Sequence, residues 1–118
     1  MRPGAAEALT AWRDYALDRD APLERRQRTL IGGAVAERLG DGAGAKTTRQ
    51  RPNSALDEAL ILMADEVTLA PWRLGSSTVA RLRAAGLRED AAVCDALATA
   101  AACTTFSRIA VASAALCN

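Results

Sequence analysis

The chain has 118 residues, of which half are hydrophobic and only 3% are aromatic. Lys and Arg number 15 and Asp and Glu 14, so the net charge of +1 provides no global field that would attract nucleic acid or an anionic membrane. Histidine is absent, which excludes imidazole acid–base catalysis and His-ligated metal sites. Length and composition together predict one all-α domain over residues 1–118, with a core of Ala, Leu and Val.

The first predicted helix spans Ala5 to Leu17, with Leu9, Trp12 and Ala16 on one face. The sequence MRPGAAEALTAWRDY carries charges before any apolar block forms, so it contains no signal-peptide core. We therefore expect a cytoplasmic protein.

A second helix follows, for which Asp20 is a candidate N-cap and Pro22 a candidate first-turn residue. Its apolar stripe consists of Leu23, Leu30, Ile31, Ala34, Val35 and Leu39. Gly40 predicts its end. Residues 40–53 are rich in Gly and Arg and lack a periodic apolar face, so we expect a flexible surface loop.

The third predicted helix begins after Ser54, a favourable N-cap, and is stopped by Pro71. Ser76 or Ser77 should cap a short helix that ends at Gly86, which can adopt the left-handed conformation of a helix C-terminus. With a final helix over residues 89–116, the chain is predicted to form a compact bundle of about five helices.

The final helix contains the most hydrophobic stretch, residues 96–116. This stretch includes Arg108 and is mostly Ala, Ser and Thr, so we expect a buried helix and no membrane association. Cys94, Cys103 and Cys117 are odd in number and widely spaced, which indicates reduced thiols. Cys94 and Cys103 should lie on opposite faces of the helix and cannot pair with each other.

Three segments of the chain form a recognisable series: Pro22-Leu23 with RTLIGGAV at 28–35, VARLRAAGL at 79–87, and FSRIA at 106–110. In this order they resemble the alkylhydroperoxidase D-like (AhpD-like) branch of the carboxymuconolactone decarboxylase family, whose closing motif is F-N-R-I-A. Residues 55–71 also resemble a family helix. The resemblance implies an all-α fold completed by oligomerisation, as a trimer or hexamer.

The chain lacks the residues that carry the family's chemistry. In register, Asp41 and Gly44 occupy the positions of the two reactive cysteines, Thr29 occupies that of the proton-relay Glu, and no His follows. A thiol peroxidase requires a thiolate, a resolving Cys and a proton acceptor. We therefore expect no thiol peroxidase activity, no cofactor and no metal.

Three charged residues are candidate catalytic groups. Asp41 could be a general base if it is buried, although turn formation in Asp-Gly is the favoured role for it. Arg108 appears within an apolar helix and should bind an anion or pair with Glu58, Asp65 or Glu66. Among these three carboxylates, Glu58 is the third candidate catalytic residue, beside Asp41 and Arg108.

The few aromatic side chains are candidate ligand-binding residues, because in a core this poor in rings they would mark a pocket or an oligomer contact. They are Trp12, Tyr15, Trp72 and Phe106. A basic neighbourhood near the loop could hold phosphate, but the low net charge makes nucleic acid an unfavoured partner. It consists of Arg25, Arg26, Arg28, Lys46, Arg49 and Arg51.

Three functions stay open from the sequence. The first is a degenerate homologue that binds a small molecule or a partner enzyme, which we favour because every family catalytic residue is missing. The second is a redeployed lyase, isomerase or cyclase that uses Asp41, Arg108 and Glu58 or Tyr15. The third is a regulatory binder that uses the basic loop. Fold alone does not decide among them.

Overall fold

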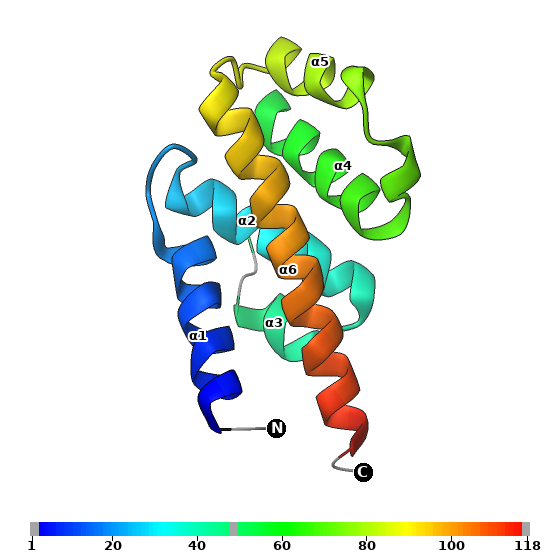
Figure 1. The fold of residues 1–118 in the computed structure, drawn as a ribbon. Coiled ribbons are helices and arrows are strands. Elements are labelled where there is room, and N and C mark those ends of the chain that lie inside the picture. Colours follow the sequence, from blue (N-terminus) through cyan, green and yellow to red (C-terminus); the bar gives the residue numbers. More distant parts are fainter. Residues whose placement is uncertain (1–2, 48–49, 117–118) are drawn as a thin grey trace.

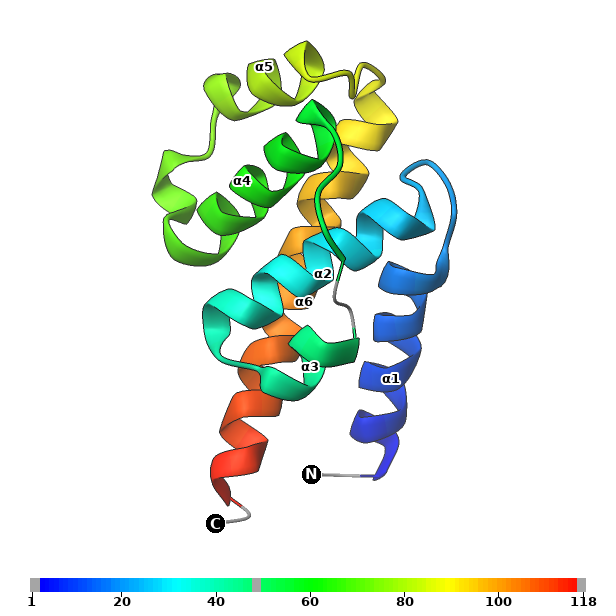
Figure 2. The same cartoon turned by 180° about the vertical axis from the view of Figure 1, so that it is seen from behind.

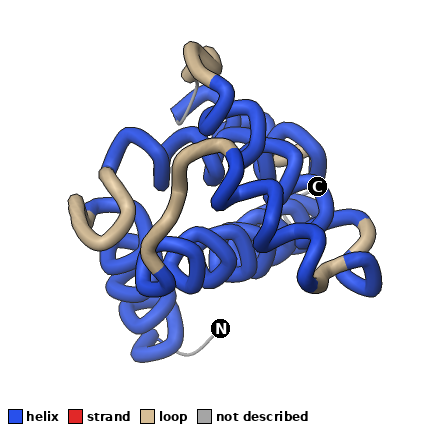
Figure 3. The backbone as a smooth tube through the Cα atoms, turned by 90° about the horizontal axis from the view of Figure 1, so that it is seen from above, coloured by secondary structure: helices blue, strands red, loops and turns tan. Residues whose placement is uncertain are grey.

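The computed structural model describes residues 3–47 and 50–116. Along the chain it contains α1 (Pro3–Asp18), α2 (Arg25–Leu39), α3 (Gly42–Thr47), α4 (Ala55–Leu69), the 3-10 turn η1 (Pro71–Arg73), α5 (Ser76–Ala84) and α6 (Asp90–Leu116) (Figure 1). These ranges contain no strand (Figure 3). The predicted all-α class is confirmed, but the described residues form six α-helices instead of five.

The helices α2 and α6 cross at the centre of the molecule, with α1 on one side and α4 and α5 on the other (Figure 1). Seen from behind, α2 and α3 cover the rear of α6 (Figure 2). Alanines at the crossing allow close approach of the helix backbones. The buried core includes Leu23, Ile31, Val35, Leu60, Met63, Ala64, Leu82, Val93, Ala96, Ala100 and Cys103.

Local end signals place several helix boundaries correctly. The Ser54 side chain accepts a hydrogen bond from the Asp57 N–H at 3.1 Å and caps α4. Gly40 ends α2 with φ +74°, and Gly86 follows α5 with φ +123°, both in the left-handed region that glycine favours. The predicted boundaries at these three residues are confirmed.

The predicted N-terminal caps of two other helices are wrong. α2 begins three residues after Pro22, and its first turn is held by Gln27, whose side chain accepts from the Glu24 N–H at 3.1 Å. Asp20 does contribute there, because it accepts from the Arg25 N–H at 2.9 Å. α5 has Gly75 as its N-cap, so neither Ser76 nor Ser77 fills that role.

The predicted loop 40–53 also requires correction, since it contains the short helix α3. Its composition gives no helical periodicity, and a contact with α6, described below, supplies the stabilisation that local sequence does not. The remaining described part, residues 50–53, has no regular structure.

By length and composition alone, α6 qualifies as a candidate membrane-spanning helix, with a mean hydropathy of 1.2 over 18 residues. The expectation that this stretch falls short of a spanning helix is therefore wrong. A core helix of a globular protein satisfies the same criterion. In this structure one face of α6, from Ala92 to Ser107, is buried against the other helices.

Candidate functional site

A small cavity lies where α1, α2, α3 and α6 meet. Its volume is about 60 Å³, and it is lined by Arg13, Leu17, Gly32, Ala36, Asp41, Gly44, Cys103, Phe106, Ser107 and Ala110. A second hollow of about 190 Å³ shares Arg13, Phe106 and Ala110 with the first and adds Leu9, Thr10 and Ile109. Together they form a crevice between α1 and α6 that is polar at its inner end and apolar at its outer end.

Asp41 lines the inner end of this α1–α6 crevice. One carboxylate oxygen accepts a hydrogen bond from the Gly44 N–H and the other accepts from the Ser107 hydroxyl, each at 3.1 Å. Asp41 therefore starts α3 and fastens it to α6. A Cβ on residue 44 would overlap the Asp41 carboxylate, which explains the glycine there.

The other two candidate catalytic residues lie outside the crevice. Arg108 is exposed, contrary to the predicted burial, and its guanidinium donates to the Thr68 carbonyl at 3.3 Å near the C-terminus of α4. Glu58 is also exposed, on α4. The proposed pairing of Arg108 with a carboxylate of α4 is wrong, because Asp65 pairs with Arg38 and Glu66 with Arg81.

The four candidate aromatic residues do not form one pocket. Phe106 lines both hollows of the crevice, and Trp12 packs edge-on against it with the ring centroids 4.7 Å apart. Tyr15 is 61% exposed and lies under the Arg19 guanidinium, 3.9 Å from the ring centroid. Trp72 is 78% exposed in η1 and does not line the crevice.

The Cys103 thiol at the crevice has low reactivity. Burial raises the pKa of Cys103 to about 12, against a weaker opposing effect of the Arg13 charge. The thiolate needed for peroxide reduction is therefore scarce at neutral pH. Cys94 is exposed on α6, in agreement with the opposite faces expected for these two residues, and Cys117 lies outside the described residues.

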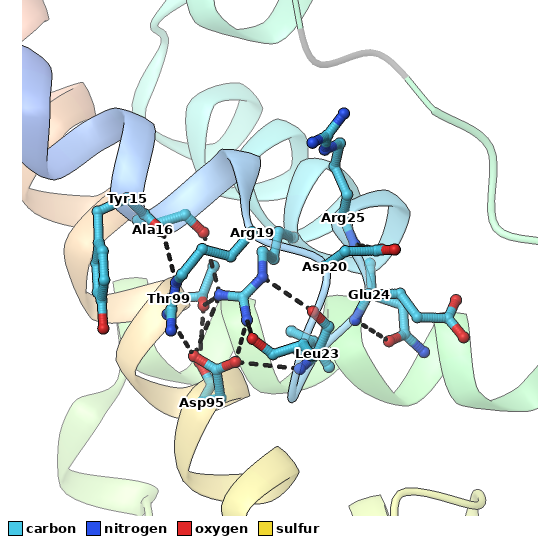
Figure 4. Close-up of polar contacts among 12 residues, drawn as sticks. Tyr15, Ala16, Arg19, Asp20, Leu23, Glu24, Arg25, Asp95 and Thr99 are labelled. Atoms are coloured by element: carbon cyan, nitrogen blue, oxygen red, sulfur yellow. Dashed lines mark hydrogen bonds and ion pairs between the residues drawn. The ribbon is translucent and has the colours of Figure 1, made fainter.

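The most extensive polar cluster, around Asp95, was not predicted (Figure 4). Arg28 is completely buried, and its guanidinium binds both carboxylate oxygens of Asp95. It also donates to the carbonyls of Ala16, Ala21 and Leu23, with N–O distances of 3.2, 3.2 and 3.0 Å. This Arg28–Asp95 clamp joins the end of α1, the α1–α2 connection and α6.

Asp95 has further donors besides Arg28. The Leu23 N–H and the Arg19 guanidinium each donate to it at 3.1 Å (Figure 4). The sequence did contain a signal for this position, because Asp95 follows Ala92 by three residues and precedes Thr99 by four, which places it near the core face. A charge at such a position needs a buried partner.

The predicted basic neighbourhood is divided among separate contacts. Arg28 is in the clamp, and Arg26 forms a two-pronged ion pair with the buried Asp57, with N–O distances of 3.0 and 2.6 Å. Arg25 donates to the carbonyl of Asp18. Arg49 lies outside the described residues. The three arginines at the start of α2 are thus used for structure, which leaves no shared anion site among them.

Acid should destabilise the fold through Asp57 and Asp95. The hydrogen bond from Arg26 lowers the pKa of Asp57 more than burial raises it. At Asp95, burial raises the pKa, but bonds from Arg28 and Leu23 and the charges of Arg28 and Arg19 together lower it further. Because both pKa values are below those of the unfolded chain, the stabilisation is complete above the unfolded value near 4 and is lost as the pH falls through the folded values.

We therefore expect the free energy of unfolding in urea to fall steadily below about pH 5. The Asp57→Asn variant should show a shallower fall than the wild type, because one of the two titrating groups is gone. A wild-type stability that stays constant from pH 6 to about pH 3 would contradict this assignment.

No group of three or more His, Cys, Asp or Glu side chains within residues 3–47 and 50–116 is arranged to hold a metal ion. The chain matches no protein-family model, and a comparison with curated proteins finds no relative. The likeness to the AhpD-like proteins thus rests on the sequence segments alone.

Proposed function

We propose that the protein is a divergent AhpD-like scaffold without thiol chemistry, which binds a small amphiphilic organic molecule in the α1–α6 crevice. The observation that carries this proposal is the gradient of chemistry along the crevice. Leu9 and Ile109 line only its outer end, Asp41 and Ser107 line only its inner end, and Phe106 lines both. Ligand sites typically combine such an apolar wall with a few polar groups.

Arg13 provides the charge that orients the ligand in this proposal. It lines both hollows and has no carboxylate partner among the described residues. An anionic group would pair with its guanidinium while the apolar body of the ligand lies against Phe106. The inner hollow, about 60 Å³, admits a small polar group such as a hydroxyl, next to Ser107.

The other two functions receive less support. For a redeployed enzyme, Asp41 would have to act as a base, but both of its oxygens already accept hydrogen bonds, and Arg108 and Glu58 lie elsewhere. For a regulatory binder with a basic loop, the arginines of α2 would have to be free, yet they hold the fold together. The proposed scaffold is cytoplasmic and homo-oligomeric, and a partner enzyme remains a second kind of occupant.

Native mass spectrometry of the protein from its own cells tests the proposal. We expect a small-molecule adduct on the wild type that is lost or greatly reduced in Arg13→Gln and Ser107→Ala. Glu58→Gln is the matched control, since it changes an exposed polar residue of α4, and it should keep the adduct. An unliganded wild type, or the same adduct in all variants, would place the function elsewhere.

A further inference from the structure

The outward face of α6 is uncovered along the whole helix, which runs across the front of the molecule (Figure 1). A stripe of mostly small residues occupies this face, at alternating spacings of three and four. It consists of Ala91, Cys94, Ala98, Ala101, Thr105, Arg108, Ala112 and Ala115. All but the half-buried Thr105 are exposed, and the stripe lies opposite the buried face of α6. A repeat of this period is typical of the seam between two helices in a left-handed coiled coil.

An apolar groove adjoins this α6 stripe. Its volume is about 580 Å³, and it shares Ala98 and Ala101 with the stripe. Its remaining walls, from α4, the η1–α5 connection, α5 and α6, are Val67, Leu74, Gly75, Thr78, Val79 and Leu97. An apolar groove of this size next to an uncovered helix is typical of an interaction surface.

We infer that this face binds a second copy of the chain, with the two α6 helices antiparallel about a twofold axis near Ala98 and Ala101. Each repeat of a coiled coil has two core positions, a and d. In an antiparallel pair, an a residue of one helix faces a d residue of the other. Centring the pair on Ala98 opposite Ala101 places Cys94 opposite Thr105 and Ala91 opposite Arg108. Only small side chains then meet near the axis, so the helices can approach to about 8 Å, the lower end of the usual range.

Charge complementarity selects the antiparallel direction. Asp90 and Arg108 are the exposed charges of α6. Asp90 also pairs with Arg83 of its own chain at the surface, and Asp95 is held in the clamp. In the antiparallel register Arg108 of each copy lies beside Asp90 of the other, on both sides of the axis. A parallel pair would instead align Arg108 with Arg108 and Asp90 with Asp90, which is repulsive.

A second copy is a better occupant than a lipid bilayer. A spanning α6 would have to leave the core, which would separate Asp95 from the buried Arg28. It would also place Arg108 and Asp95 in the hydrocarbon region, at a high cost in free energy. A self-paired α6 keeps the clamp intact. This inference specifies the oligomer of the proposed function but does not depend on its ligand.

Disulfide trapping tests the register. In a Cys117→Ser background, Thr105→Cys should form a covalent dimer on mild oxidation, because Cys94 of one copy faces residue 105 of the other. Cys117→Ser alone should stay uncrosslinked, since antiparallel pairing separates the two Cys94 residues by about 16 Å along the axis. Ala114→Cys, an exposed position on the opposite side of α6, is the control and should not trap a dimer.

Analytical ultracentrifugation tests the interface independently of cysteines. We expect a wild-type assembly containing the dimer, and we expect Ala98→Lys with Ala101→Lys to weaken dimerisation by about 100-fold, because four like charges would meet at the axis. The circular dichroism spectrum of this double variant should match that of the wild type, because residues 98 and 101 are exposed and their replacement leaves the core intact. A monomeric wild type, a covalent dimer through Cys94 in Cys117→Ser alone, or partition of monomers into phosphatidylcholine vesicles would overturn the inference. A monomeric wild type would also remove the homo-oligomer from the proposed function, but none of these outcomes bears on the ligand adduct lost in Arg13→Gln, so ligand binding and dimerisation fail separately.

Discussion

Replacing Asp95 with Ala should lower the free energy of unfolding by about 3–5 kcal/mol, the range for breaking a buried ion pair by removal of one partner. The completely buried guanidinium of Arg28 would lose its counter-ion, and the Leu23 N–H would lose its acceptor. The carbonyls of the α1–α2 connection would still bind Arg28 but cannot neutralise its charge. Urea unfolding at pH 7 measures the effect.

Asp90→Ala is the matched control, because it removes the same side chain from the same helix. The Asp90 carboxylate is 86% exposed and pairs with Arg83 at the surface, so its removal should cost no more than about 1 kcal/mol. Equal losses in the two variants would show that the Arg28–Asp95 clamp contributes no more than a surface ion pair.

Leu60→Ala should also be strongly destabilising, by about 2–5 kcal/mol. Leu60 is fully buried in α4 and belongs to the same core cluster as Ile31 and Val35 of α2. Truncation removes apolar surface from the core and leaves a cavity that the surrounding helices fill only in part. The midpoint of urea unfolding should fall with little change in slope.

Leu62→Ala provides the comparison for that variant, since it is the same substitution on the same helix at a side chain that is 46% exposed. It should cost no more than about 1 kcal/mol. If Leu62→Ala destabilises as much as Leu60→Ala, then Leu62 is buried by a partner in solution, and the packing of α4 described here is incomplete.

Boundaries set by neighbouring residues were predictable from the sequence, whereas features set by distant contacts were not. Ser54, Gly40 and Gly86 act within a few residues of the helix end that each one defines. The short helix α3, in contrast, depends on Asp41 reaching Ser107, 66 residues away. No local periodicity encodes such a contact, so a loop was predicted there.

The orientation of α6 was ambiguous for a different reason. Alanine occupies both the buried and the exposed face, so hydrophobic periodicity does not distinguish them. Arg108 was therefore predicted to be buried, although it lies at the surface, and the burial of Asp95 was missed. Of the candidate site residues, Asp41 and Phe106 line the crevice and Trp12 packs against Phe106, whereas Arg108, Glu58, Tyr15 and Trp72 lie elsewhere.

The clamp between Arg28 and Asp95 also bears on biosynthesis. Asp95 emerges from the ribosome long after Arg28, and until then the guanidinium has no carboxylate with which to enter the core. Before α6 is synthesised, α1, α2 and α4 can form only as transient helices. The unpaired Arg28 and the apolar face that α6 will cover both oppose the packing of these helices. Folding is therefore expected to wait for the synthesis of α6, with chaperones having access to the preceding helices until Asp95 has emerged.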